Sequence, residues 1–461
     1  MDSKLSHGTN PLFFVGIGGI GMSALARYFM HCGHPVGGYD RVRTPISQSL
    51  EEMGAEISYR DDIEELPKRF QSADTLVVYT PAIPHDNAFL KYYESHGYTL
   101  HKRSEILGLI TRNTQALCVA GTHGKTTTST LLAHILYQSH IGANAFLGGV
   151  SLNYSSNLLL HESSPYVVIE ADEYDRSFHS LTPYMAIITA TSSDHLDIYG
   201  TDDAYKEAFR HFASLVDPEG LIVMYEDADP GEGEEIRAEI LKYGHKSSSD
   251  YRYSNIKYEN GELYFDWEGP SVMIRELQIG VPVEINVVNA TAAIAVALRC
   301  GCTEVEIRAA LKSFRGAHRR FERVLNDPRV PILLDDYAHH PEEIQASLDS
   351  IHKLYPDRRI TVVFQPHLYS RTRDFQEEFG RTLSVVDDVI LLDIYPAREE
   401  PIPGVTSVSL LPFISSGSKK VCTKEGLLSE LQSHDFEVLV MMGAGDIEFE
   451  VPKVRDYLLH L

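Results

Sequence analysis

The sequence predicts an α/β protein of three domains, and three observations lead to this prediction. Short apolar runs with the length of buried strands alternate with stretches whose apolar residues recur at helical spacing. Two strand-to-helix turns are rich in glycine, and other strands end in polar residues, as in open α/β sheets. The length of 461 residues is too great for one core. We expect domains at residues 1–112, 113–316 and 317–461.

Composition and charge narrow the classes of function. The chain is 43% hydrophobic and 23% charged, as in soluble globular proteins. Its net charge of −24 argues against nucleic acid as a partner, because phosphate backbones are bound by basic surfaces. Five scattered cysteines form neither a disulfide framework nor a zinc pattern, and they fit a reducing cytoplasm. Since no apolar run approaches the roughly 20 residues of a membrane span, no membrane insertion is expected.

The first domain opens with a dinucleotide-binding pattern. The strand at residues 12–15 leads into G-x-G-x-x-G, formed by Gly16, Gly18 and Gly21, and then into a helix. Asp40 ends the next strand, about 20 residues further on. Alone, this pattern indicates a Rossmann-like domain that holds a diphosphate at a helix N-terminus, as in NAD-dependent oxidoreductases. Asp40 is then either a ribose ligand or a solvated turn residue.

The central domain opens with a phosphate-binding loop. The apolar strand at residues 116–120 is followed by Gly121-Thr-His-Gly-Lys125-Thr126 and a helix. In such a loop backbone N–H groups face the anion, Lys125 reaches the outer phosphates, and the Thr126 hydroxyl can hold Mg²⁺. The usual spacing would need glycine at Val119. A glycine turn with a surface lysine is the alternative, but the order of residues favours an ATP site and a P-loop ATPase-like domain.

Acidic residues follow the next strands of this domain. The strand at residues 166–169 ends in Glu170, and the strand at residues 185–188 is followed by His195. Carboxylates at a strand end beside an ATP loop favour at least one metal ligand, with a solvated acidic turn as the alternative. For His195 two interpretations are equally favoured, a metal ligand and a structural residue. The polar segment at residues 226–264 is expected to be a surface excursion.

The third domain repeats the alternation of strands and helices and is predicted to be Rossmann-like as well. The strand at residues 331–334 ends in Asp335, and the strand at residues 360–364 is followed by His367 and Arg371. Because polar residues at the carboxyl ends of parallel strands meet at one edge of a sheet, these side chains are candidates for a binding site.

Taken together, these residues resemble the Mur ligases of bacterial cell-wall synthesis. The resemblance covers nearly the whole chain and depends on the order of its motifs, none of which is specific alone. The motifs are Gly16-Ile-Gly-Gly-Ile-Gly-Met22, Gly121-Thr-His-Gly-Lys-Thr126, Glu170-Ala-Asp-Glu173, Asp194-His-Leu-Asp197, Asn286-x-x-Asn289-Ala, His318-Arg-Arg-Phe-Glu322, Asp335-Asp-Tyr-Ala-His-His-Pro341 and Gln365-Pro-His-x-Tyr-Ser-Arg-Thr372.

The resemblance implies a role for each group. The N-terminal domain would hold the UDP of a sugar nucleotide, not NAD, through Gly16, Gly18, Gly19, Ile20, Gly21, Met22 and Asp40. ATP would be bound by Gly121, Thr122, His123, Gly124, Lys125, Thr126, Thr127, Asn286, Asn289, Arg320 and Asp335; the two asparagines could instead be helix caps. Mg²⁺ would be held by Thr126, Glu170 and His195. The catalytic residues would be Lys125, His195, His339 and Arg371, and the amino acid would be bound by His367 and Arg371.

The resemblance also implies an activity. In these ligases a carboxylate attacks the γ-phosphate of ATP, and an amine then attacks the resulting acyl phosphate. The motifs are most similar to those of members that join L-alanine to the lactyl carboxylate of UDP-N-acetylmuramate. The expected setting is the bacterial cytoplasm, and the expected state is a monomer or weak homodimer. His195 or His339 would serve as the base, although a metal-bound His195 could not, so the base stays unassigned.

Two positions depart from the family pattern, and three other functions remain open. Ile285 stands where relatives often have histidine, and Leu368 where they often have arginine, so Arg371 would bind the amino acid without that neighbour. A related ligase joins a whole tripeptide to the same sugar nucleotide. An NAD-dependent oxidoreductase would leave the Lys125 loop without a role. A non-catalytic nucleotide switch would bind ATP without releasing phosphate.

Overall fold

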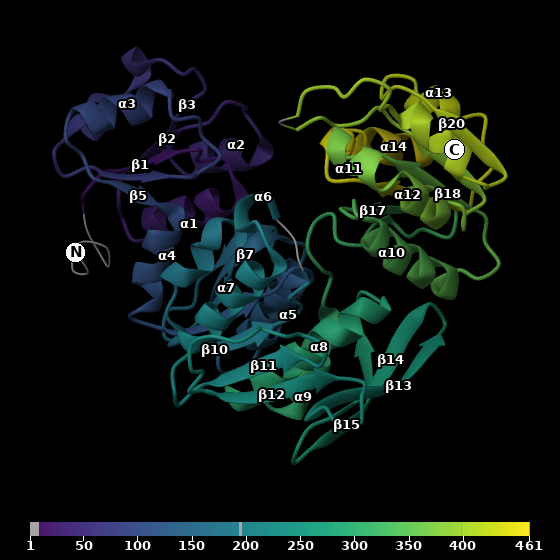
Figure 1. Cartoon of the computed structure of the whole chain (residues 1–461), viewed down its shortest axis with the longest axis horizontal. Coiled ribbons are helices and arrows are strands. Elements are labelled where there is room, and N and C mark those ends of the chain that lie inside the picture. Colours follow the sequence, from purple (N-terminus) through teal and green to yellow (C-terminus); the bar gives the residue numbers. More distant parts are fainter. Residues whose placement is uncertain (1–8, 193–195, 398, 461) are drawn as a thin grey trace. The chain divides into compact units, whose positions relative to one another are not determined.

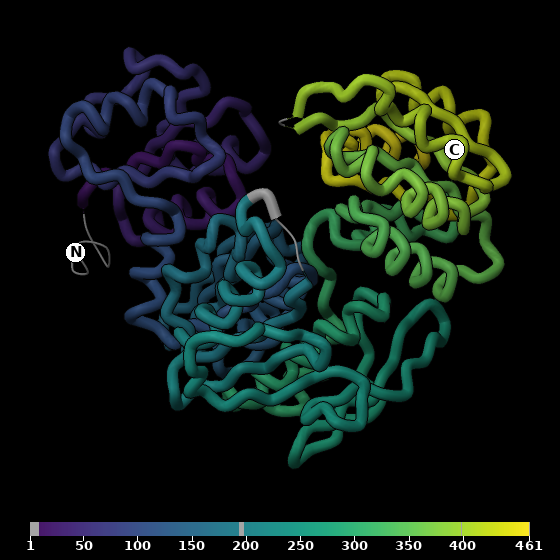
Figure 2. Tube along the Cα trace, viewed as in Figure 1, coloured from purple at the N-terminus to yellow at the C-terminus, as the bar shows by residue number. Residues whose placement is uncertain are grey.

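The computed structural model describes residues 9–192, 196–397 and 399–460. It forms three sheets with helices packed along them (Figure 1), and the trace passes through the sheets in chain order (Figure 2). The chain divides into two compact units. The first unit comprises the described residues up to 254 with 266–277 and 288–314, and the second comprises 255–265, 278–287 and the described residues from 315 onward.

The N-terminal sheet has five parallel strands in the order β3-β2-β1-β4-β5. The strands are β1 (Leu12–Val15), β2 (Val36–Tyr39), β3 (Glu56–Ser58), β4 (Leu76–Tyr79) and β5 (Leu100–Lys102). The helices are α1 (Ile20–His31), α2 (Pro45–Glu52), α3 (Ala88–Ser95) and α4 (Arg103–Thr111), with 3₁₀ turns η2 (Ile63–Glu65) and η3 (Lys68–Gln71). This strand order is Rossmann-like, and the order in which successive strands are added to the sheet reverses between β1 and β4, beside the first glycine loop.

Alternate side chains of β1 build a core on each face of this sheet, because successive residues of a strand point to opposite sides. Phe14 lies 6.4 Å from Phe29 of α1, and Phe13 lies 5.4 Å from Phe89 of α3, between ring centroids. In Figure 1 α1 and α3 lie on opposite sides of the sheet. The other side of α1 packs on the central sheet, where Asn157 donates to the Ile20 carbonyl at 2.7 Å.

The central sheet has ten strands in the order β15-β14-β13-β12-β11-β10-β6-β9-β7-β8. They are β6 (Gln115–Ala120), β7 (Asn144–Ser151), β8 (Ser156–Leu159), β9 (Tyr166–Glu170), β10 (Pro183–Ile188), β11 (Leu221–Tyr225), β12 (Glu239–Gly244), β13 (Tyr251–Glu259), β14 (Glu262–Glu268) and β15 (Met273–Ile279). Its helices are α5 (Lys125–Gln138), α6 (Leu196–Tyr199), α7 (Asp202–Ser214), α8 (Glu284–Arg299) and α9 (Glu304–Ser313), with the 3₁₀ segment η4 (Tyr174–Ser180).

The segment at residues 226–264 differs from the expected surface excursion. It contributes β12, β13 and the start of β14 to the central sheet. Most side chains of β12 and β13 are exposed or half-buried, and in the part of β14 that belongs to this segment only Leu263 is buried. Strands with so few buried side chains have a composition like that of a surface loop, which is why composition alone did not reveal them.

The C-terminal sheet has six strands in the order β16-β17-β21-β18-β19-β20, all parallel except β16. They are β16 (Glu322–Leu325), β17 (Ile332–Asp336), β18 (Ile360–Phe364), β19 (Asp388–Leu391), β20 (Ser418–Val421) and β21 (Val438–Met442). The helices are α10 (Pro341–Leu354), α11 (Tyr369–Asp374), α12 (Gln376–Leu383), α13 (Leu427–Leu431) and α14 (Val451–Leu458), with 3₁₀ segments η5 (Ser407–Phe413) and η6 (Asp446–Phe449).

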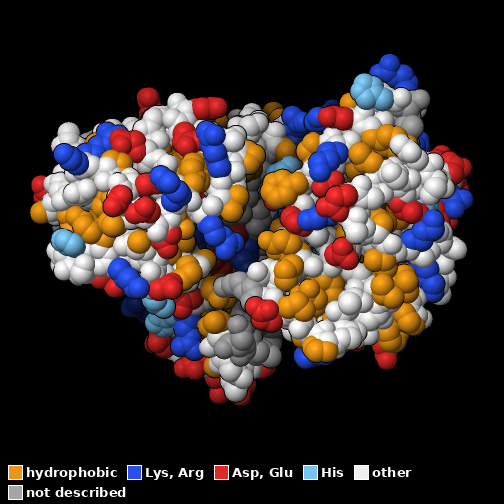
Figure 3. Space-filling view, turned by 90° about the horizontal axis from the view of Figure 1, so that it is seen from above, with side chains coloured by type: hydrophobic (Ala, Val, Ile, Leu, Met, Phe, Trp, Pro, Cys, Tyr) orange, Lys and Arg blue, Asp and Glu red, His pale blue; other side chains and the backbone are white. Residues whose placement is uncertain are grey.

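The surface and the thiols add two observations. All five cysteines are free. On the face drawn in Figure 3, acidic, basic and apolar side chains are intermixed, which agrees with a strongly acidic chain that presents no large basic field there. Within the described residues no helix is both long enough and apolar enough to cross a membrane.

Candidate active site

The phosphate loop connects β6 to α5 at the carboxyl end of the strand. Gly121 and Gly124 have φ angles of +136° and +81°, in the left-handed region that favours glycine. A Cβ at Gly121 would lie 2.0 Å from Thr189 Oγ1 and 2.8 Å from the Ala190 nitrogen, so this position also allows the end of β10 to approach closely. Because α5 begins at Lys125, the unpaired N–H groups of its first turn face the loop. The loop therefore has the geometry of an anion site.

Lys125 is held in this loop by a carboxylate. Its ammonium lies 2.8 Å from both carboxylate oxygens of Glu173 and donates to the Gly121 carbonyl at 2.8 Å. Burial lowers the pKa of this lysine, but the carboxylates of Glu173, Asp172 and Glu170 raise it by more, so the net shift is upward. The side chain is therefore an ammonium at neutral pH and can donate to phosphate oxygens.

Glu170 ends β9 among other oxygen atoms. Ser129 Oγ donates to it at 3.4 Å, and Thr126 lies one turn earlier in α5 and is buried. A Cβ at Gly148 would lie 2.1 Å from a Glu170 carboxylate oxygen, so the backbone of β7 packs directly against this group. Hard oxygen donors suit Mg²⁺, and Thr126 and Glu170 fit the predicted ion. The third predicted ligand, His195, lies outside the described residues.

The N-terminal glycine loop follows β1. Gly16 has a φ of +94°, and the Gly18 N–H donates to Asp40 Oδ2 at 2.8 Å. Asp40, predicted as a ribose ligand, thus also fixes the loop to the end of β2. A Cβ at Gly21 would lie 2.3 Å from Nη1 of Arg103, so the absence of a side chain lets this guanidinium lie against the first turn of α1. A cation there suits the predicted diphosphate.

One cavity of about 340 Å³ joins the two parts of the site. Its lining includes the first turn of α1 and Arg103 on the N-terminal side, and Gly148, Glu170 and Asp172 on the central side. All of these residues belong to the first compact unit. Arg103 lies 3.7 Å from Asp172. The loop predicted for the sugar nucleotide and the carboxylate predicted for the metal therefore face one cavity.

The two asparagines predicted to contact adenine have different surroundings. Asn289, on α8, lies against the phosphate loop, since a Cβ at Gly124 would be 3.0 Å from Asn289 Oδ1. Asn286 belongs to the second compact unit and donates from Nδ2 to the Val281 carbonyl at 3.2 Å. Asn289 thus lies at the loop within the first unit, and the contact of Asn286 with adenine stays a prediction.

Asp335 is a buried carboxylate near the end of β17, in the second unit. It is 1% exposed, and among the described residues neither of its oxygens has a hydrogen-bond partner. Burial raises its pKa to about 7, although Arg319, whose Nε lies 3.7 Å away, lowers it. The guanidinium of Arg320 lies 4.8 Å from the centroid of the Tyr337 ring. The two acceptor oxygens of Asp335 fit the predicted contact with ribose hydroxyls, and the half-buried Arg320 is a cation for the predicted contact with phosphates.

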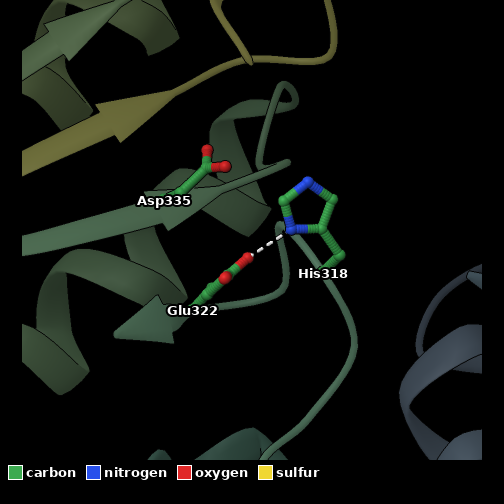
Figure 4. A group of neighbouring side chains, drawn as sticks. All are labelled: His318, Glu322 and Asp335. Atoms are coloured by element: carbon green, nitrogen blue, oxygen red, sulfur yellow. Dashed lines mark hydrogen bonds and ion pairs between the residues drawn. The ribbon is translucent and has the colours of Figure 1, made fainter. Parts of the chain in front are cut away.

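The same place could be read as a metal centre, because His318, Glu322 and Asp335 offer ligand atoms within 4.8 Å of one another (Figure 4). His318 Nδ1 is already 2.6 Å from Glu322, and this hydrogen bond raises the pKa of His318. A protonated imidazole nitrogen cannot bind a metal, and the guanidinium of Arg319 repels a cation. The group therefore fits a nucleotide hydroxyl better than an ion.

His339, His367 and Arg371 lie together in the second unit. The two imidazole centroids are 5.8 Å apart, and Tyr395 stacks on His367 at 5.7 Å. Nδ1 of His339 donates to the Tyr337 carbonyl at 2.9 Å, which leaves Nε2 as an acceptor. Burial lowers the pKa of both histidines, that of His367 to about 4. In the described part of the chain, His367 Nδ1 and Arg371 Nη1 are buried without hydrogen-bond partners. The cluster can accept a proton and bind a carboxylate.

Comparison with known proteins identifies the family. The model described as Mur ligase family, catalytic domain, matches residues 12–115, that of the Mur ligase middle domain matches 119–297, and that of the Mur ligase, glutamate ligase domain, matches 319–418. The chain is 49% identical to UDP-N-acetylmuramate–L-alanine ligase of Phocaeicola vulgatus over 96% of this chain and 97% of the relative. The chain belongs to the Mur ligase family. The ligase of the same name from Porphyromonas gingivalis is 50% identical over 97% and 98% of the two chains.

Solved structures of Mur ligases share the fold. The UDP-N-acetylmuramate-alanine ligase of Thermotoga maritima superposes with a TM-score of 0.83 at 27% identity, covering 98% of this chain and all of the other. A murein peptide ligase from Psychrobacter arcticus gives a TM-score of 0.69 at 25% identity, covering 98% and 99% of the two chains. The predicted α/β fold of three domains is thereby confirmed.

Sequence reasoning missed three residues of this Mur ligase site. Glu173 was read only as part of an acidic stretch, whereas it pairs with Lys125. Arg103 lines the cavity and Tyr337 lies under Arg320, and neither was predicted. A weak signal existed for Glu173, because a carboxylate buried at a strand end needs a cation. No such signal existed for Arg103 or Tyr337, because a single basic or aromatic residue forms no recognisable sequence pattern.

Proposed function

We propose that this Mur ligase joins L-alanine to the lactyl carboxylate of UDP-N-acetylmuramate, while ATP is converted to ADP and phosphate. The observation that carries the proposal is the single cavity between the N-terminal glycine loop and Glu170, since the reacting carboxylate must reach the γ-phosphate. Relatives named UDP-N-acetylmuramate–L-alanine ligase, 42–50% identical over nearly the whole chain, support the choice of substrates. The product is a peptidoglycan precursor, and these substrates place the reaction in the bacterial cytoplasm.

The first step is phosphoryl transfer. A lactyl carboxylate oxygen attacks the γ-phosphorus, the bond to the bridging oxygen breaks, and ADP leaves with that oxygen. Lys125 and the N–H groups at the start of α5 neutralise charge on the transferred group, and Arg103 orients the attacking carboxylate. Mg²⁺, held by Thr126, Glu170 and His195, would supply further positive charge at the phosphates. Asn286, Asn289, Arg320 and Asp335 hold the rest of ATP.

The second step forms the amide. The neutral amine of L-alanine attacks the acyl carbon, and the tetrahedral adduct collapses with loss of phosphate. Arg371 and His367 hold the amino-acid carboxylate, and Nε2 of His339 is positioned as an acceptor for the proton of the amine. Its lowered pKa keeps the imidazole neutral at pH 7. The domain limits at 112 and 316, and a monomeric or weakly dimeric state, stay predictions.

Phosphate release tests the proposal directly. The protein is assayed with ATP, Mg²⁺ and UDP-N-acetylmuramate, and with L-alanine, glycine, L-serine or the tripeptide L-Ala-γ-D-Glu-meso-diaminopimelate as acceptor. We expect the highest kcat/KM for L-alanine. The structural similarity to a murein peptide ligase makes tripeptide ligation the second candidate, and release with the tripeptide alone would establish that activity instead. ATP binding without release in any mixture would support a non-catalytic switch.

A further inference from the structure

The ammonium of Lys125 is restricted on two sides. It meets both oxygens of Glu173 at 2.8 Å, the Gly121 carbonyl at 2.8 Å and the Thr122 carbonyl at 3.5 Å. An unconstrained lysine has four rotatable side-chain bonds and strong hydration, so it does not hold one position by itself. These contacts restrict its position, and Glu173 contributes the only side chain among them.

Glu173 is itself rigidly placed. It is 1% exposed, and it belongs to the turn that follows β9, residues 172–176, here named the acidic turn. Within this turn Asp175 and Arg176 have φ angles of 53° and 54°, a left-handed conformation that is unfavourable for residues other than glycine. Such a backbone persists only where surrounding contacts hold it. The hydroxyl of Tyr199 provides one such contact by donating to the Glu173 carbonyl.

The acidic turn is fastened at three further points in the first unit. Asp172 lies 3.7 Å from Arg103, and Asp175 lies 3.0 Å from Nζ of Lys102. The guanidinium of Arg176 lies 5.3 Å from the ring centroid of Tyr199. Two of these partners, Lys102 and Arg103, stand at the junction of β5 and α4 in the N-terminal sheet. The position of Glu173 is therefore determined by contacts from outside the phosphate loop.

We propose that Glu173 is a positioning residue for Lys125: it fixes the ammonium over the loop so that Lys125 meets the charge that develops on the transferred phosphoryl group. The proposal rests on the proposed function, because it assigns Lys125 to phosphoryl transfer. Removal of the carboxylate leaves the ammonium with carbonyl contacts only and frees its rotation. Binding of ATP then persists, while the alignment that the transition state needs is lost.

Glu173→Gln tests this, because it keeps the shape of the side chain and removes its charge. We expect kcat to fall by about tenfold or more while the Kd for ATP, measured by calorimetry, does not rise. Glu173→Asp, which keeps the charge on a shorter chain, should recover part of kcat. Glu306→Gln is the control, since that glutamate caps α9 beyond the far end of α5. A kcat within twofold of the wild type, or a Kd that rises in parallel with the loss of kcat, would overturn the proposal.

A second variant tests the same proposal in case Glu173→Gln does not fold. Asp175→Asn removes the Lys102 ion pair, and asparagine tolerates the left-handed backbone. We expect a severalfold loss of kcat at unchanged Kd for ATP. Asp202→Asn is the matched control for Asp175→Asn, because it also removes an ion pair between a lysine and an aspartate, here 2.9 Å long and on α7. This control should leave kcat unchanged. Equal kcat for Asp175→Asn and wild type would count against the acidic turn as the support of Glu173.

Chemical labelling of Lys125 tests the role of Glu173 independently of the proposed ligase activity. An amine-reactive ester reaches a lysine amine only when that amine can leave its partners, and Glu173 holds the amine of Lys125 through both carboxylate oxygens. We expect Lys125 of Glu173→Gln to be labelled severalfold faster than in the wild type, read by mass spectrometry. Unchanged labelling would contradict the role of Glu173. Faster labelling in a protein that releases no phosphate with any acceptor would refute the ligase activity and support the role of Glu173.

Discussion

The negative charges of Glu173, Asp172 and Glu170 raise the pKa of Lys125, and of the three carboxylates Glu173 is the one in direct contact with its ammonium. A bound triphosphate would add negative charge beside these carboxylates. The charge of one lysine cannot balance all of it, so a further cation is needed for the triphosphate to bind. Glu170 is the group best placed to recruit it, since it faces the cavity and lies near oxygen donors. At the scale of single residues, the proposed site therefore combines one fixed cation, Lys125, with a proposed metal ion taken up from solution.

Replacement of this lysine should separate chemistry from recognition of the sugar nucleotide. Lys125→Ala removes the cation from the phosphate loop, and we expect phosphate release to fall by roughly 10²–10³-fold or more. UDP-N-acetylmuramate should still bind with its wild-type Kd in calorimetry, because its predicted loop follows β1 and not β6. Lys206→Ala, which removes a lysine from the exposed face of α7, is the control. Loss of sugar-nucleotide binding in Lys125→Ala would contradict the assignment of two separate loops.

At the scale of elements, β7 and β9 fix the proposed metal ligand. The backbone of Gly148 approaches the Glu170 carboxylate so closely that a methyl group would overlap it. Gly148→Ala should displace Glu170 and raise the Mg²⁺ concentration needed for half-maximal phosphate release, by about tenfold. In Gly426→Ala, the new methyl group meets no atom closer than 3.6 Å, and this variant should not change the requirement. An unchanged Mg²⁺ requirement in Gly148→Ala would argue against Glu170 as a ligand.

A second element-scale feature is the buried His134 of α5. Nδ1 of His134 lies 2.7 Å from the Tyr154 hydroxyl, and Nε2 lies 3.0 Å from Ser313 Oγ at the end of α9. Burial lowers the pKa of His134 from 6.5 to about 4. The unfolded chain therefore takes up a proton at a higher pH than the folded chain, so stability is present above pH 6.5 and is lost as the pH falls toward 4.

This titration gives a measurable pH dependence of stability. Urea unfolding of the wild type between pH 7 and pH 4.5 should show a loss of stability to which His134 contributes about 2 kcal/mol. His134→Gln cannot take up a proton and should lose less stability over the same range. His31→Gln, at an exposed position near the end of α1, should behave like the wild type. Identical pH dependence in His134→Gln and wild type would exclude this contribution.

At the scale of the whole molecule, the residues proposed to act on ATP belong to two compact units. Lys125, Glu170 and Asn289 belong to the first unit, and Arg320 and Asp335 belong to the second. If one ATP molecule is bound by both sets, binding must bring the units into a defined arrangement and keep water from the acyl phosphate.

Solution scattering tests this arrangement. We expect the radius of gyration to fall when ATP and UDP-N-acetylmuramate are added together, compared with the protein alone. Asp335→Ala, which lacks the proposed ribose acceptor in the second unit, should show a smaller change. Equal scattering curves for the wild type with and without both ligands would argue against closure of the C-terminal domain.

Much of the site could be predicted from the sequence, because the informative groups are contiguous. Two glycine turns, Lys125 and the acidic strand end are local patterns, and their conformations follow from positive φ at glycine and from the geometry of helix N-termini. The strands β12 and β13 and the start of β14 were missed between residues 226 and 264, because their mostly exposed or half-buried side chains give the segment a polar composition. His195 lies outside the described residues, so its predicted role stays a prediction.

By itself the sequence determined the α/β class of this Mur ligase, its two glycine-rich strand-to-helix turns and the identity of its family, because these depend on short-range periodicity and on the order of motifs. Only the tertiary structure decided which charges meet. Lys125 and Glu173 are 48 residues apart, Lys102 and Asp175 are 73 apart, and the cavity joins α1 to β9. Lys125 and Glu173 meet where strand ends converge at one edge of the central sheet, and Lys102 and Asp175 meet where the N-terminal sheet approaches the central sheet. Local patterns carry no information about which of the converging side chains will pair.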